Sequence, residues 1–167
     1  MRMVDKLIIP RWIGADKQRR VELHAFADAT RRAMATALYC RTTDPRSKTT
    51  SVSLLWAKSK LSPVRSLVPA EKSPTRMTIP RLELRAALLA AKLLRYVATS
   101  LNVPLSNCYM WGDSQVVLHW LRSDSPTGNN FVDDYIAHIQ ELAPTISWRY
   151  VPTGENPADI ATRGTDV

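Results

Sequence analysis

Residues 21–28, VELHAFAD, alternate apolar and other side chains with the period of a β-strand that buries one face. The run ends on a carboxylate, Asp28, where the strand should meet a turn. We therefore expect the folded core to begin here, with Asp28 at the end of its first strand. The apolar positions of the run are Val21, Leu23, Ala25 and Ala27.

Two more strand-like runs follow on the C-terminal side of this stretch. They are RAMATALYC at residues 32–40 and SVSLLWAK at residues 51–58. A polar loop centred on Asp44, Pro45 and Arg46 separates them. Neighbouring strands joined by short turns are typical of an antiparallel meander, so we expect the first three strands to pair in this way.

The period of the pattern changes after a long basic, proline-containing segment at residues 62–78, which we predict to be an exposed loop. Pro80 suits the first turn of a helix, and apolar residues then recur at steps of three or four. This is the clearest helix in the chain, and Asn102 and Pro104 are expected to end it. Its apolar face consists of Leu82, Ala86, Leu89, Leu93 and Val97.

The remaining elements are shorter. NCYMWGD, at residues 107–113, is predicted to be a buried strand ending at Asp113. After it we expect helices at residues 114–121 and 130–142, a strand at residues 146–152, and a short helix in ENPADIATRG opened by Asn156 and Pro157. The predicted order of elements is therefore βββαβααβα.

The length and charge of the chain limit its class. The 167 residues fit one domain with an apolar core, which we assign to residues 21–164, with residues 1–20 as a linker or extension and residues 165–167 as a tail. Lys and Arg outnumber Asp and Glu by 23 to 15, and the net charge of +8 favours nucleic acid over an anionic membrane as partner. No apolar run approaches the roughly 20 residues that cross a bilayer. The start, MRMVDKLIIPRW, lacks the apolar core of a signal peptide, so an intracellular location is expected.

Cysteine, histidine and tryptophan do not suggest a site. Cys40 and Cys108 lie in apolar runs, where a free thiol packs as a small hydrophobe. His24, His119 and His138 lack the close spacing of a zinc site and are expected to have packing or surface roles. Four tryptophans follow apolar patterns and are expected in the core rather than as stacking platforms. They are Trp56, Trp111, Trp120 and Trp148.

Four acidic residues lie near predicted element ends, in the order Asp, Glu, Asp, Asp. They are Asp28, Glu83, Asp113 and Asp159. Three of them have an ordinary structural explanation. Asp28 could form a turn, Glu83 could be stabilised by the helix dipole in a first helical turn, and Asp113 could cap a helix. Together, with no matching set of His or Cys, they are the oxygen-rich ligands that Mg²⁺ or Mn²⁺ prefers.

Five sequence blocks carry a resemblance to a known family. They are HAFADAT (24–30), AKSKLSP (57–63), TIPRLELRAALLAAKLL (78–94), MWGDSQVVLHWL (110–121) and NPADIATRG (156–164). The chain resembles the ribonuclease H domain of the polyprotein of BEL/Pao-type long-terminal-repeat retrotransposons over nearly all of residues 21–164. The resemblance implies an α/β ribonuclease H-like fold of mixed α+β character. Its five-stranded mixed sheet would have the first three strands antiparallel and be flanked by helices.

The same resemblance implies an endonuclease that cuts the RNA strand of an RNA/DNA hybrid with two Mg²⁺ or Mn²⁺ ions about 3.5 to 4 Å apart. Carried over by position, the catalytic, metal-binding carboxylates fall on the four acids named above. Asp28 and Asp113 would anchor the ions. Glu83 would help to hold a metal and sense the RNA 2′-hydroxyl, and Asp159 would complete the second metal. Because close carboxylates repel one another, such a site should be strained without cations.

Hybrid binding is expected to rest on backbone contacts near these acids. The cations could neutralise phosphates, and Ser114 and Gln115 could contact a groove, although each cation also has the simpler explanation of a solvated surface charge. Discrimination for RNA would come from its 2′-hydroxyl. The candidate nucleic-acid-binding residues are Arg31, Arg32, Lys58, Lys60, Arg85, Ser114 and Gln115.

Two features depart from the family pattern. Many ribonucleases H carry a His in the loop before the final Asp, whereas VPTGENPAD at residues 151–159 has none, so slower turnover is expected. The loop at residues 62–78 is also longer than expected. As partners the resemblance implies the reverse transcriptase and integrase regions of a parent polyprotein, with residues 1–20 extending from the polymerase region. It implies a location in cytoplasmic virus-like particles or in the nucleus.

Two other functions are compatible with these patterns. A decayed retroelement could leave an inactive ribonuclease H-fold domain that binds nucleic acid or connects other regions, but the presence of all four acids argues against simple loss. An integrase or transposase core shares the fold class, but its acids follow the order Asp, Asp, Glu. Here the Glu comes second.

Overall fold

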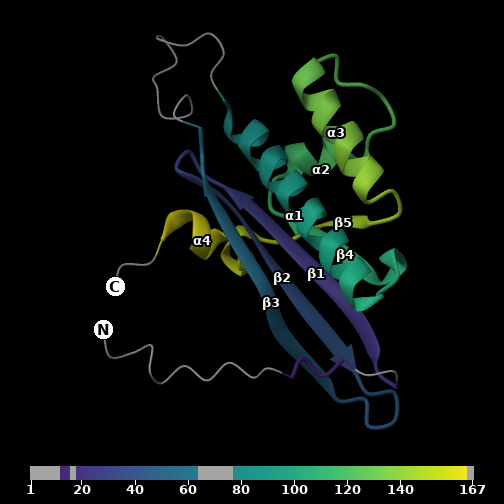
Figure 1. Cartoon of the computed structure of the whole chain (residues 1–167). Coiled ribbons are helices and arrows are strands. Elements are labelled where there is room, and N and C mark those ends of the chain that lie inside the picture. The colour runs from purple at the N-terminus through teal and green to yellow at the C-terminus, as the bar shows by residue number, and fades with distance from the viewer. Residues whose placement is uncertain (1–11, 16–17, 64–76, 165–167) are drawn as a thin grey trace.

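The protein is built around a mixed five-stranded sheet with the strand order β3-β2-β1-β4-β5 (Figure 1). A computed structural model describes residues 12–15, 18–63 and 77–164. The first three strands form the antiparallel meander predicted from the sequence, and β4 and β5 continue the sheet in parallel pairing beside β1. The strands are β1 (Arg20–Ala29), β2 (Ala33–Thr43), β3 (Thr50–Leu61), β4 (Cys108–Gly112) and β5 (Ser147–Tyr150).

The helices lie on both sides of this sheet. Figure 1 shows α1, α2 and α3 grouped on one side and the short α4 on the other. Contacts of α1 with β1 and β2, and of α4 with the same two strands, agree with this view. None of the helices in the described ranges has the length and apolar character needed to span a membrane. The helices are α1 (Ile79–Leu101), α2 (Gln115–Arg122), α3 (Asn130–Leu142) and α4 (Asp159–Arg163), with 3-10 turns η4 (Leu105–Asn107) and η5 (Thr153–Glu155).

The long helix α1 has the ends that its sequence predicts. Pro80 lies in its first turn, and Asn102 ends it in the left-handed conformation with φ of 58°, which asparagine adopts more readily than most residues. Its buried stripe contains many alanines, such as Ala87 and Ala91, and the predicted Leu82 and Leu93. The prediction was wrong for Leu89, which is only partly buried and lines a groove instead. Small side chains on this stripe let the helix pack closely on β1 and β2.

The two faces of the sheet differ in their side chains. The inner face packs on α1 and contributes Leu23, Ala25, Leu38 and Met110 to the core. Cys40 and Cys108 are buried and free, as predicted. Because side chains alternate along a strand, the intervening residues point to the opposite side, which we call the outer face. By register, the outer face carries Glu22, His24, Phe26, Asp28, Tyr39, Arg41, Tyr109, Trp111 and Arg149.

Some predicted boundaries were wrong by a few residues. β2 and β3 extend further than predicted, to Thr43 and Leu61. The last helix begins at Asp159, two residues after the Asn156 and Pro157 that were predicted to open it. The predictions for most of residues 1–20, for the loop at residues 64–76 and for the tail at residues 165–167 lie outside the described residues.

The prediction that the tryptophans belong to the core was wrong for two of them. Trp120 and Trp148 pack against the core. Trp56 on the edge strand β3 is 43% exposed and meets Tyr96 of α1 edge to face. Trp111 lies on the outer face, among other partly exposed rings. An apolar alternation shows that a strand has two faces, but it does not show which face helices cover.

Candidate active site

The four acidic residues come from four elements that meet near one end of β1. Ala27 of β1 pairs with Gly112 of the adjacent parallel strand β4. Asp28 and Asp113 are the next residues in sequence, so they lie side by side at the same end of these strands. Glu83 lies on α1, which packs on the inner face, and Asp159 begins α4 on the outer face. The topology therefore brings acids from both sides of the sheet to the same edge.

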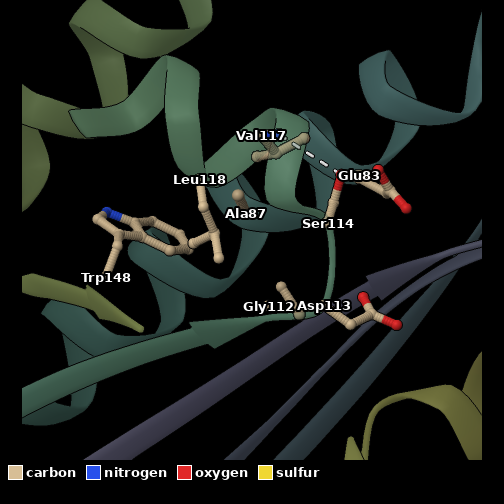
Figure 2. A pocket seen from close by; sticks show the side chains of 9 residues that line it. Glu83, Ala87, Gly112, Asp113, Ser114, Val117, Leu118 and Trp148 are labelled. Carbon is tan, nitrogen blue, oxygen red and sulfur yellow. Dashed lines mark hydrogen bonds between the residues drawn. The ribbon is translucent and has the colours of Figure 1, made fainter. Parts of the chain in front are cut away.

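Glu83 and Asp113 line a small pocket together with Ser114. In Figure 2 both carboxylates point to the same side of the view, away from Trp148 and Leu118. Ser114 is the N-cap of α2, because its Oγ accepts a hydrogen bond of 3.5 Å from a backbone N–H of the first turn. The explanation of Asp113 as a helix cap is therefore wrong, and Asp113 is left beside Glu83.

Asp28 is buried, with 5% of its surface exposed. Burial raises the pKa of its carboxyl group, the Thr162 hydroxyl that donates to Oδ2 opposes this rise, and the charges of Asp113 and Asp159 add to it. Two of the other acids are therefore close enough to repel Asp28. The ionised form of Asp28 is disfavoured in the metal-free protein.

Glu83 has the same electrostatic character. Burial raises the pKa of its carboxyl group, a hydrogen bond with Ser114 opposes the rise, and the charges of Asp113 and Asp28 raise it further. The alternative explanation of Glu83 as an acid in a first helical turn is wrong, because α1 begins at Ile79 and Glu83 lies beyond that turn.

Asn156 connects the segment before α4 to the strand that carries Asp28. Its side chain is 3% exposed. The amide group donates to the carbonyl oxygen of Ala27 at 3.0 Å, and Oδ1 accepts from the N–H of Ala158 at 3.1 Å. The sequence pattern predicts Asn156 only as a helix opener. Its position three residues before Asp159 was the available signal, but the contact with β1 follows from the tertiary fold.

Replacing Asn156 by Ala is expected to destabilise the domain by about 2 to 3 kcal/mol, because a buried carbonyl and a buried N–H lose their partner together. Urea unfolding followed by circular dichroism measures this change. Asn130→Ala, at an exposed position in α3, is the matched control and should cost far less. Equal costs for the two variants would contradict the structural role of Asn156.

The donor set suits a hard divalent cation, but the present side-chain positions do not form a closed ligand shell. Within the described ranges, no group of three or more His, Cys, Asp and Glu residues is placed to hold a metal ion. Asp159 Oδ1 accepts from Arg163 Nε at 2.6 Å, while Thr162 donates to Asp28 and Ser114 hydrogen-bonds with Glu83. Three of the four acids therefore have a neighbouring donor, which offsets part of the repulsion between like charges when no cation balances them.

The candidate nucleic-acid-binding residues are placed around this edge. Arg31 and Arg32 are exposed in the turn between β1 and β2, directly after the strand that carries Asp28. Lys58 is exposed on β3, and Gln115 is the exposed first residue of α2. Ser114, which is also predicted as a groove contact, caps α2 and hydrogen-bonds with Glu83.

Lys60 and Arg85 line one groove between β3 and α1. The groove also contains Lys92 and Tyr135, which sequence reasoning did not include. Lys92 lies two helical turns beyond Arg85, so helical spacing was the signal that could have identified it. The fold thus gathers three cations that are separated in the sequence.

Comparison with known protein families decides the classification. Residues 1–114 match the family described as the Pao retrotransposon-like RNaseH-like domain. The chain belongs to this family. The matched range includes Asp28, Glu83 and Asp113 and ends before Asp159. A comparison with curated proteins gave no match.

Solved structures confirm the ribonuclease H fold of this Pao-family domain. RNase H1 from the archaeon Halobacterium salinarum is 16% identical, with a TM-score of 0.52, and the similarity covers 85% of this chain and 92% of that chain. The N-terminal RNase H domain of a Mycobacterium tuberculosis protein is 15% identical, with a TM-score of 0.52, covering 84% and 89% of the two chains. At these identities the similarity shows the fold alone.

Proposed function

We propose that this Pao-family domain is a divalent-metal-dependent ribonuclease H that cuts the RNA strand of RNA/DNA hybrids. The observation that supports it best is the electrostatic coupling of acids from four elements at one edge of a ribonuclease H fold. Membership of a retrotransposon RNaseH-like family agrees with this activity.

The four acids would hold the metal, with Asp28 and Asp113 as the anchoring pair and Glu83 and Asp159 on either side. When bound, two Mg²⁺ or Mn²⁺ ions would activate a water and stabilise the leaving oxygen. The hydroxyls of Ser114 and Thr162 orient two of the carboxylates. Arg163 is exposed, so it is free to swing away from Asp159 when a cation balances the acids.

The hybrid would contact the cations that surround this edge. The groove lined by Lys60, Arg85 and Lys92 would bind backbone phosphates. Arg31 and Arg32, exposed in the turn after the strand that carries Asp28, would add further phosphate contacts. Phosphate contacts of this kind fix position and carry no sequence preference. The parent retrotransposon polyprotein would supply the reverse transcriptase and integrase regions as partners.

A second candidate is a non-catalytic domain that binds hybrids without cutting them. The pairing of Asp159 with Arg163 and the open arrangement of the acids in the described residues favour it. The loop at residues 151–159, which has no His, is also compatible with weak turnover.

Incubation with a hybrid labelled on its RNA strand distinguishes the two candidates. A ribonuclease H should cut the RNA when Mg²⁺ or Mn²⁺ is present, stop when EDTA is added, and leave RNA/RNA and DNA/DNA duplexes of the same sequence intact. The products should carry 5′-phosphate and 3′-hydroxyl ends. Tight hybrid binding with no cleavage under either metal would support the non-catalytic function instead.

A further inference from the structure

The outer face of the sheet carries a row of aromatic side chains that the proposed hydrolysis does not use. The rings come from three adjacent strands, and all are partly exposed. They are absent from the core cluster formed by the described residues. The row consists of Tyr39 on β2, His24 and Phe26 on β1, and Tyr109 and Trp111 on β4.

These rings form one continuous set of contacts. His24 stacks on Tyr109, with centroids 5.0 Å apart, and on Trp111 at 6.0 Å. Phe26 stacks on Trp111 at 5.8 Å with an angle of 13° between planes, and meets Tyr39 edge to face at 5.8 Å. Trp111 Nε1 donates to His24 Nδ1 at 3.2 Å, which holds the indole in place. The row is therefore an ordered surface that spans β2, β1 and β4.

Cations border the row. The guanidinium of Arg149 lies 4.3 Å from the ring centroid of Tyr109 and 5.5 Å from that of Trp111. Arg149 is exposed, and no ion pair is recorded for it among the described residues. Arg20 and Arg41 share a single acid, Glu22, at 2.9 and 2.5 Å. This part of the surface therefore keeps a net positive charge.

The row also continues toward the candidate active site. Phe26 and Asp28 point to the same side of β1 two residues apart, which is about 7 Å along a strand. In the described structure α4 contacts β1 and β2, and it reaches Asp28 through Thr162. The rings lie further along the same face, beyond that contact.

We propose that this outer face binds single-stranded nucleic acid, with bases stacking on the aromatic row and on Arg149 and phosphates neutralised by the bordering arginines. Aromatic rings on a β-sheet combined with a positive border are the chemistry by which proteins bind unpaired bases with little sequence preference. A base-paired hybrid keeps its bases stacked inside the duplex, so this surface selects unpaired strands. The binding needs neither metal nor hydrolysis.

Affinity for a labelled 12-nucleotide single-stranded RNA, measured by fluorescence anisotropy in EDTA, tests the proposal. Arg149→Ala and Trp111→Leu should each weaken binding roughly 5- to 50-fold. The matched control is Arg95→Ala, an exposed arginine on α1, which should change the affinity by less than about twofold. The proposal also gives Arg149 a phosphate contact. Arg149→Ala should therefore make the plot of log binding constant against log salt concentration shallower by about 0.7, whereas Trp111→Leu should leave this slope unchanged.

An abasic oligonucleotide of the same length separates stacking from charge, because Trp111→Leu should not alter its binding. Equal affinities of Arg149→Ala and Arg95→Ala for single-stranded RNA would overturn the proposal, and this comparison remains valid if Trp111→Leu does not fold. Self-association that Trp111→Leu abolishes, with RNA affinity unchanged, would also overturn it and make the row a protein interface. The binding assay contains no metal and measures no cleavage. Its result therefore stands even if the domain proves unable to cut RNA/DNA hybrids.

Discussion

Asp28→Asn is expected to lower the rate of metal-dependent hybrid cleavage by at least about a thousandfold, equivalent to about 4 kcal/mol of transition-state stabilisation. Asp28 is the most buried of the four acids, and burial and two acidic neighbours raise its pKa. Asparagine keeps the shape and an oxygen for the Thr162 hydroxyl, but it removes the charge that a divalent cation needs. Asp113→Asn should have a similar effect. Single-turnover cleavage of an end-labelled hybrid gives the rate directly.

Hybrid affinity should be unchanged in both variants, because the proposed phosphate contacts come from cations such as Lys60, Arg85 and Lys92. Asp134→Asn, at an exposed position on α3, is the control for removing one negative charge and should cleave at the normal rate. Cleavage that persists in Asp28→Asn and Asp113→Asn would show that the activity resides elsewhere or in a contaminant.

The sequence predicts the order of elements well where a local pattern is complete. The helix α3 has the bounds predicted from its pattern, since an Asn precedes it and apolar residues recur along it. The five-residue α4 is too short to show a helical period, so its start was predicted from Asn156 and Pro157 and was wrong. Short elements depend on tertiary contacts, which a local pattern does not contain.

The sequence identifies which residues form the candidate site, but it does not predict how they are arranged in space. Asp28 and Asp113 meet because β4 inserts beside β1 in parallel, a pairing between residues about 85 positions apart that no local pattern fixes. The partners of the acids, Thr162 and Arg163, likewise follow from the fold. The same limit explains the wrong prediction for Trp111, because the alternation in β4 does not reveal that α1 covers only one side of the sheet.

In metal-free buffer at pH 7, Asp28→Asn is expected to be more stable than the natural chain by roughly 1 kcal/mol, or about 2 to 4 °C in Tm. Burial and the nearby charges raise the pKa of Asp28, so the folded protein disfavours its ionised form at neutral pH. A carboxyl group with a raised pKa stabilises the fold below its ordinary pKa, near 4, and loses that contribution as pH rises through the folded value. The advantage of the variant should therefore shrink as the pH is lowered toward 4.

Divalent metal should reverse this order of stability. At a concentration 100 times its dissociation constant, a cation that binds only the folded state adds about 2.7 kcal/mol. The natural chain should gain this increment with Mg²⁺ or Mn²⁺, whereas Asp28→Asn should gain little, and Asp134→Asn should follow the natural chain. Thermal unfolding of the three proteins, once in EDTA and once with metal, shows whether the order of their Tm values reverses. If Asp28→Asn were the less stable protein in EDTA at pH 7, the repulsion among the acids would not be the strain that cations relieve.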